Sequence, residues 1–180
     1  MKRISFAFAA FCLFILAASS LQAQMGPPSP APELKNLDFL CGEWTSKGTI
    51  NLGPGMPNGG KFSDTSHVEW MEGKYFLVSH SEGDFGAMGK AKELAVFGYD
   101  SDKKMYTYTS FSSTGEANTS TGTANGDTWT WTSDEHMGGM TMKGRFTMKV
   151  LSPTSYTMKY ELSQDGKEWM TAMEGKATKK

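Results

Sequence analysis

The segment "HMGGMTM" brings one imidazole and three thioether side chains close together in the sequence. These belong to His136, Met137, Met140 and Met142. Thioether sulfur and imidazole are ligands that suit Cu(I), so a copper site is one hypothesis for this segment. Methionine is also an adaptable filler of irregular cores, and the same residues fit that simpler interpretation.

Methionine is abundant in the whole chain, with 13 residues, and many of them alternate with polar residues. Alternation predicts that one face of each strand is apolar, and together these faces would line the inside of a barrel. The predicted lining consists of Trp44, Trp129, Trp131, Met142, Phe146, Met148, Tyr156, Met158, Tyr160, Trp169 and Met173. Met56, Met88, Met137 and Met140 are expected at its rim. Such a lining suits a small hydrophobic, lipid-like ligand, and solid core packing is the alternative.

Acid–base chemistry has one candidate group, formed by Asp64, His67 and Glu69. Alternation separates Asp64 from the other two residues, and a solvated strand face is the favoured interpretation. The chain contains no GxSxG motif, no HExxH motif and no paired cysteine ligands. We therefore favour a non-enzymatic binding protein and expect no cofactor.

The N-terminus has the features of an export signal. Lys2 and Arg3 precede an apolar run of about 15 residues, which is short for a membrane span, and Ala23 is small enough to precede a cleavage site. Residues 1–23 are thus predicted to be a signal peptide cleaved after Ala23, with an uncleaved membrane anchor as the alternative. The mature protein would be secreted or periplasmic. A proline-rich linker, 24–33, and one domain, 34–180, would follow.

Charge and cysteine content exclude several classes of partner. The formal net charge is −1, and loss of Lys2 and Arg3 would make it −3. Arg145 would then be the only arginine, so neither nucleic acid nor an anionic membrane surface is an expected partner. Cys41 would be the sole cysteine, which precludes an internal disulfide.

Strand signals recur from residue 43 onward, separated by Gly-, Asn-, Asp- or Pro-containing turns such as "YDSDKK", "ANGD" and "SQDGK". The predicted strands are 43–51, 61–71, 74–83, 92–99, 104–112, 116–124, 127–133, 140–151, 155–163 and 167–176. Short connections indicate an antiparallel meander. Closure into an up-and-down β-barrel of about ten strands would remove the sheet edges, so we expect an all-β barrel.

A short helical plug is predicted before the first strand. Leu34, Leu37 and Leu40 recur every third residue, which is the spacing of one face of a 3₁₀ turn. Gly42 would allow a sharp bend, and Trp44 would then fill the bottom of the barrel.

The segments "LDFLCGEWTSKGTI", "EWMEGKYFLVSHSEG", "FGYDSDKKMYTYTSFSSTGE" and "SQDGKEW" carry a resemblance to a known family. They resemble the secreted bacterial family known as domain of unknown function 1579, over roughly residues 33–176. That family is similar in turn to nitrobindin-like and lipocalin-like (calycin) barrels. The resemblance implies a barrel with one closed and one open end, and it implies no catalytic residues.

Two features of those related barrels do not transfer to this sequence. Lipocalin-like barrels place a basic side chain over the first tryptophan, but Arg145 alternates with Lys143 and Lys149 on the polar face. Nitrobindin-like barrels bind haem through a C-terminal histidine, and the last three predicted strands contain none. We therefore do not expect haem.

The order of the strands predicts which connections share an end. In a ten-stranded meander the odd-numbered connections emerge together, and these are the longer, glycine-rich ones: 52–60, 84–91, 112–116, 133–139 and "SQDGK". They would surround an open mouth, opposite a floor sealed by the plug. A ligand cavity at this mouth is the leading hypothesis, and a solid barrel acting as a protein-interaction module is a further alternative. The oligomeric state is left open.

Overall fold

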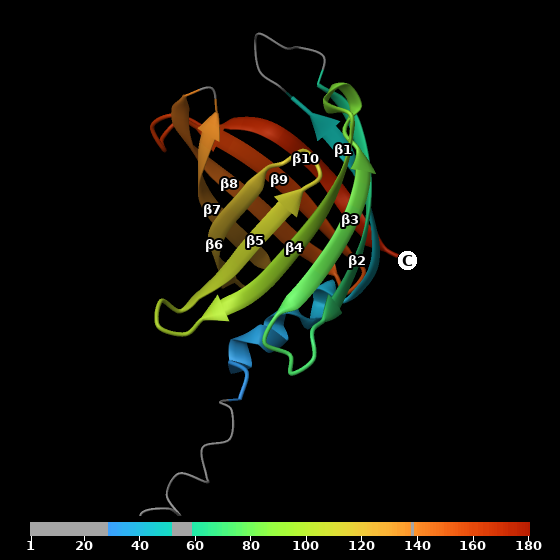
Figure 1. Cartoon of the computed structure of the whole chain (residues 1–180), viewed down its shortest axis with the longest axis vertical. Helices are drawn as coiled ribbons and strands as arrows, with labels where there is room; N and C mark the ends of the chain where they lie inside the picture. The colour runs from blue at the N-terminus through green and yellow to red at the C-terminus, as the bar shows by residue number, and fades with distance from the viewer. Residues whose placement is uncertain (1–28, 52–58, 138) are drawn as a thin grey trace, which may run out of the picture. The chain divides into compact units, whose positions relative to one another are not determined.

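Ten antiparallel strands close into a single barrel in the computed structural model, which describes residues 29–51, 59–137 and 139–180 (Figure 1). Each strand pairs with its neighbours in the sequence, and β1 closes the barrel against β10. The strands are β1 (Gly42–Ile50), β2 (Gly60–Trp70), β3 (Leu77–Asp84), β4 (Lys90–Asp100), β5 (Met105–Ser112), β6 (Ala117–Asn125), β7 (Thr128–Met137), β8 (Met140–Ser152), β9 (Ser155–Ser163) and β10 (Met170–Lys179).

The predicted all-β meander is confirmed, and each of the ten predicted strands overlaps an observed one. The differences of three or more residues lie at a few strand ends. Strand β7 extends to Met137, so most of the expected loop 133–139 is strand, and β3 begins at Leu77 and not at residue 74. Strand β10 begins at Met170 rather than at residue 167, because the turn at 164–169 is longer than predicted.

The predicted plug is the 3₁₀ helix η1 (Pro32–Leu40), which begins within the segment interpreted as linker. Leu34, Leu37 and Leu40 share one face because a 3₁₀ helix has three residues per turn, and all three are buried in the main core. Gly42 follows with φ of 117°, a backbone conformation that glycine adopts without strain, and starts β1. Figure 1 shows η1 at the lower end of the barrel.

Side-chain hydrogen bonds fasten the plug to the strands. Trp44 donates from Nε1 to the carbonyl of Leu40 at 2.7 Å, and Trp70 donates from Nε1 to Oδ1 of Asp38 at 2.8 Å. The hydroxyl of Tyr106 donates to the carbonyl of Glu33 at 3.1 Å. The first of these bonds satisfies a buried indole N–H, which would be costly if left without an acceptor.

The basic side chain over the first tryptophan is Lys179. Its Nζ lies 5.2 Å from the Trp44 ring centroid and donates to the carbonyl of Phe39 at 3.0 Å. Arg145 lies instead on the outer face, as its alternation predicted, where it pairs with Glu161. The barrel therefore uses a C-terminal lysine to close its floor.

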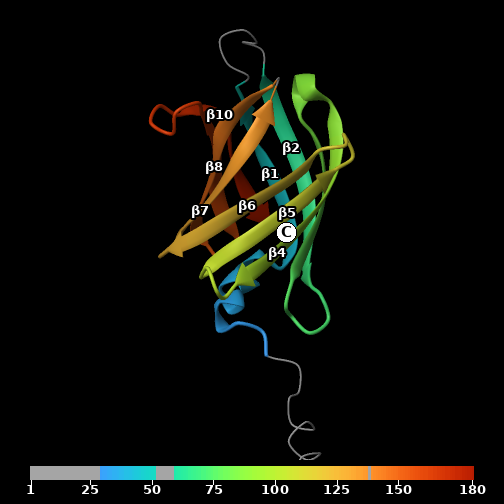
Figure 2. The ribbon, with the colours of Figure 1, turned by 60° about the vertical axis from the view of Figure 1, so that its left-hand side comes forward.

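The opposite end carries the odd-numbered connections of the described part of the chain (Figure 2). There β3 and β4 are joined through the short 3₁₀ helix η2 (Gly86–Met88), and β9 and β10 through residues 164–169. The connection 52–58 lies outside the described residues, as do the predicted signal peptide, its cleavage site and linker residues 24–28. Within the described ranges, no helix has the length and apolarity needed to cross a membrane.

Candidate functional site

The strand register defines which side chains face the inside of the barrel. Trp44 is buried in the core, and directly paired residues in an antiparallel sheet point to the same face. Trp44 pairs with Ser66 on β2, and Ser66 pairs with Ser81 on β3. Ser66 and Ser81 therefore face inward as well. The same rule applied around the closed barrel assigns an inward or an outward face to the paired residues of every strand.

Strands β7 to β10 form an apolar inner wall. Ten of the eleven predicted lining residues face inward, and two of them, Trp44 and Trp129, belong to the sealed floor. The inward residues of this wall are Trp129, Trp131, Met142, Phe146, Met148, Val150, Tyr156, Met158, Tyr160, Leu162, Met170 and Met173. Phe146, Tyr160 and Met173 are only half-buried, so part of this wall remains accessible towards the open end.

Trp169 is the exception, and the prediction that it lines the cavity is wrong. Trp169 precedes β10, and the centroid of its ring lies 3.9 Å from Cζ of Arg145 on the outer surface. A register shift between Thr171 and Met173 adds one residue to β10. A bulge of one residue reverses which face of the sheet the preceding side chains point to. Strict alternation counted back from Met173 therefore assigned Trp169 to the wrong face.

The four residues of the copper hypothesis are not brought onto one face. His136 points outward, where its Nδ1 lies 3.1 Å from Oγ1 of Thr141. Met140 and Met142 belong to the inward set, and Met140 is 56% exposed at the rim. Alternation therefore places the imidazole and these two thioethers on opposite sides of the hairpin. No group of three or more His, Cys, Asp or Glu side chains that could hold a metal occurs among the described residues.

Strands β1 to β6 contribute a mixed inner wall, and the sequence patterns did not indicate its polar residues. Its inward polar residues are Ser46, Asp64, Ser66, Ser79, Ser81, Glu93, Tyr108, Ser110, Ser112, Asn118 and Ser120. Asp64 is separated from His67 and Glu69, as alternation predicted, but it faces the interior and not a solvated outer face. His67 and Glu69 point outward, and His67 contacts both Glu43 and Glu69. Asp64 shares its face with Phe62 and Val68, and this alternation was the available signal.

Two carboxyl groups meet on this mixed wall. Ser81 hydrogen-bonds the Asp64 carboxyl and is the direct register partner of Glu93 on β4. The hydroxyl of Tyr108 donates to Oε1 of Glu93 at 2.9 Å. The four side chains thereby form a continuous polar chain over strands β2 to β5, about halfway along the barrel.

Burial and a neighbouring negative charge raise the pKa of Asp64 and of Tyr108. Burial, followed by the charge of Glu93, raises the pKa of Asp64 to about 7, against a smaller opposing effect of the Ser81 hydrogen bond. Burial likewise raises the pKa of Tyr108, and the neighbouring Glu93 charge raises it further. At neutral pH Asp64 is therefore partly protonated, and the pair is suited either to proton transfer or to binding a cation.

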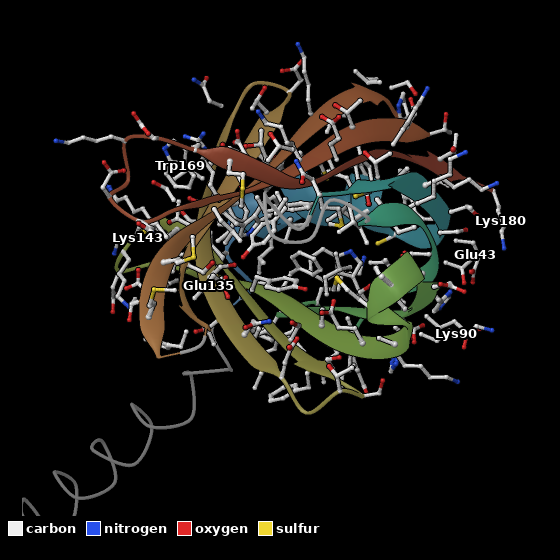
Figure 3. All side chains as sticks on the ribbon, turned by 90° about the horizontal axis from the view of Figure 1, so that it is seen from above. Glu43, Lys90, Glu135, Lys143, Trp169 and Lys180 are labelled. Carbon is white, nitrogen blue, oxygen red and sulfur yellow. The ribbon has the colours of Figure 1, made fainter. Side chains whose placement is uncertain are left out.

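A second polar group interrupts the apolar wall near the open end. Glu135 accepts a hydrogen bond from Ser133 and another from Tyr160. Gly144 lies directly beneath them, since a Cβ there would come within 2.9 Å of the Tyr160 hydroxyl. Figure 3 looks down this end and shows Glu135 within the ring of strands, with Lys143 and Trp169 outside it.

Trp131 presents a hydrogen-bond donor without a partner. The residue is 5% exposed, faces inward, and its Nε1 is the buried side-chain polar atom that remains unsatisfied in the described part of the chain. Its ring contacts Phe97 at 6.3 Å between centroids, and Phe97 contacts Tyr108 at 5.0 Å. A buried N–H that lacks an acceptor costs free energy, which an acceptor bound in the interior would recover.

A family comparison places this barrel among known sequences. Residues 29–179 match a family described as "Protein of unknown function (DUF1579)". The chain belongs to the DUF1579 family. No curated protein matches it.

A solved structure supports the barrel fold independently of the family. The crystal structure of Rv2717c from M. tuberculosis is similar to this DUF1579 chain with a TM-score of 0.56 and 13% sequence identity, over 84% of this chain and 99% of that one. At such low identity the likeness concerns the fold alone. It therefore carries no information on the chemistry of the inner walls of the DUF1579 barrel.

Proposed function

We propose that this DUF1579 barrel is an exported, non-enzymatic binding protein that holds a small amphipathic molecule in its interior. The observation that carries the proposal is the uneven inner surface: inward polar residues gather on β2–β6, among apolar ones such as Phe62 and Leu77, whereas the inward residues of β7–β10 are mainly apolar. A ligand with an apolar body and one polar group would be complementary to both walls at once.

Accessibility distinguishes the two ends of the interior. The floor is filled by the plug and by buried side chains such as Trp44 and Leu77. Above it Asp64, Ser81 and Glu93 face inward and are only half-buried. Rigid strands with accessible inward side chains near one end are the usual setting of a barrel ligand site.

Export is part of the proposal and rests on the sequence of residues 1–23. The apolar run and the small residue before the cleavage site are those of a signal peptide. N-terminal sequencing of the protein from the producing cell should begin at Gln24.

Ligand binding is tested by native mass spectrometry of protein purified without detergent and by titration with decanol. We expect a small molecule to co-purify, or decanol to quench or shift the tryptophan fluorescence saturably with one binding event. The variant Met158→Lys, which introduces a charge on the inner wall, should abolish the response. The matched control Met71→Lys, at an exposed turn, should retain it. Absence of both co-purified ligand and decanol binding would refute the proposed function.

A further inference from the structure

The charges of the barrel are distributed unequally between its two faces. Asp64, Glu93 and Glu135 all face inward. Among the lysine and arginine residues on the described strands, Lys179 alone faces inward, and it is held at the floor by the Phe39 carbonyl and the Trp44 ring. The inner carboxyl groups therefore have no cationic partner in the described part of the chain.

This distribution is costly without a ligand. A carboxylate removed from water is stabilised by an opposite charge or by hydrogen-bond donors, and two carboxylates near each other repel. Glu93 receives one donor, from Tyr108, on Oε1, and Asp64 receives one, from Ser81. Both carboxyl groups thus retain acceptor capacity directed into the interior.

The aromatic residues beside the pair favour the same kind of ligand. Tyr108 and Phe97 pack together at 5.0 Å between ring centroids, and Trp131 lies next to Phe97. Aromatic faces attract cations as well as apolar groups. The buried Nε1 of Trp131 lies against Gly122 of β6 and has no hydrogen-bond partner in the described part of the chain, so polar capacity on this side of the inner wall is also unused.

We infer that the ligand of this barrel is an amphipathic amine, whose ammonium group binds between Asp64 and Glu93 and whose apolar part lies on the wall formed by β7–β10. An ammonium group has three donors and one positive charge, which match the two carboxyl groups. A fatty acid would bring a third negative charge to the same place. This inference rests on the proposed function and specifies its ligand class.

Three probes with the same chain length separate charge from hydrophobicity: decylamine, decanol and decanoate, each titrated below its aggregation concentration at pH 8. We expect decylamine to bind at least about tenfold more tightly than decanol, as charge-assisted hydrogen bonds imply, and decanoate to bind more weakly than either.

The double variant Asp64→Asn, Glu93→Gln preserves the side-chain volumes and removes both charges. It should eliminate the preference for decylamine while leaving the affinity for decanol within about twofold, because the apolar wall is unchanged. Glu82→Gln is the matched control, since Glu82 lies on the outer face of β3 and pairs with Lys92. This control should keep the full preference. If the double variant does not fold, Asp64→Asn alone should still reduce the preference.

The outcomes distinguish the two proposals. Decanol binding without a preference for decylamine would overturn the inference and leave the proposed function standing. So would a preference that survives the double variant, because the amine would then bind elsewhere. Failure of all three probes to bind would overturn both.

Discussion

Tyr108 donates a 2.9 Å hydrogen bond to Glu93 across neighbouring strands inside the barrel. The bond occupies Oε1 and orients the carboxyl group, so that its other oxygen stays available to a ligand. Asp64 lies on the far side of Ser81, within range of the Glu93 charge. This arrangement gives an otherwise ordinary antiparallel barrel a defined polar site.

The raised pKa of Asp64 predicts an unusual dependence of stability on pH. The folded protein holds the Asp64 proton up to a pKa of about 7, whereas the unfolded chain releases it near the ordinary value of 3.8. The free energy of unfolding contributed by this group should therefore fall as pH rises from about 4 to about 7, and stay low above that. Glu93 is the titratable group that acts on Asp64, and the Asp64 charge in turn helps to raise the pKa of Tyr108 and of Tyr156.

Asp64→Asn should remove this penalty. We expect the variant to be more stable than the wild type at pH 8 by about 1–3 kcal/mol, after allowance for solvent in an accessible interior, and to differ little at pH 4. Urea unfolding at both pH values gives the comparison. A variant that is less stable at pH 8 would show that Asp64 is stabilised as a carboxylate in the free protein.

The plug should contribute strongly to stability. Leu37 is fully buried between η1 and the strands, so Leu37→Ala is expected to cost about 2–5 kcal/mol through lost burial and a cavity. Leu151→Ala is the control, because Leu151 is 51% exposed, and it should change the free energy of unfolding by less than about 0.5 kcal/mol. Equal effects of the two substitutions would mean that η1 does not seal the floor.

An ion pair on the outer face should also be structurally important. The Glu161 side chain is 7% exposed, and its Oε2 lies 2.9 Å from Nη2 of Arg145, which stacks on Trp169. Burial alone would raise the pKa of Glu161, but hydrogen bonds from Lys159 and Arg145 outweigh it and lower that pKa. Arg145→Met should cost about 2–3 kcal/mol at pH 7, since it leaves a buried carboxylate with Lys159 alone.

Lys143→Met is the matched control for Arg145→Met, in the same strand. Lys143 and Asp134 form an ion pair in which both side chains are more than half exposed, so its loss should cost less than about 1 kcal/mol. The penalty at Arg145 should shrink as pH falls through the lowered pKa of Glu161, because protonation removes the charge that Arg145 neutralises. A penalty independent of pH would assign the effect to packing on Trp169 instead.

Much of the fold could be predicted because local signals agreed. Leu34, Leu37 and Leu40 marked the plug by their spacing, and turn residues separated the alternating strands. Trp169 was misplaced because no local signal marks the extra residue of β10. The basic residue over Trp44 was missed because Lys179 meets Trp44 only when the first and last strands close the barrel.

The polar site around Asp64 and Glu93 was not predicted from the sequence patterns, for a different reason. The rule that polar residues face water assigned Asp64 to the outer face, although Phe62 and Val68 on the same strand share its facing. The proposed ligand-binding interior would depart from that rule, because groups that bind a ligand must leave bulk water. Glu93 and Tyr108 could be grouped with Asp64 only after the register of β2 to β5 was known.

The most direct test of ligand binding inside the barrel is methyl NMR of protein labelled with ¹³C at the methionine methyl groups, with and without decanol. We expect the signals of the inward residues Met142, Met158 and Met173 to shift saturably together, while the signal of Met71, exposed in the turn after β2, stays in place. Shifts confined to Met71, or no saturable shift at the three inward residues, would contradict the account.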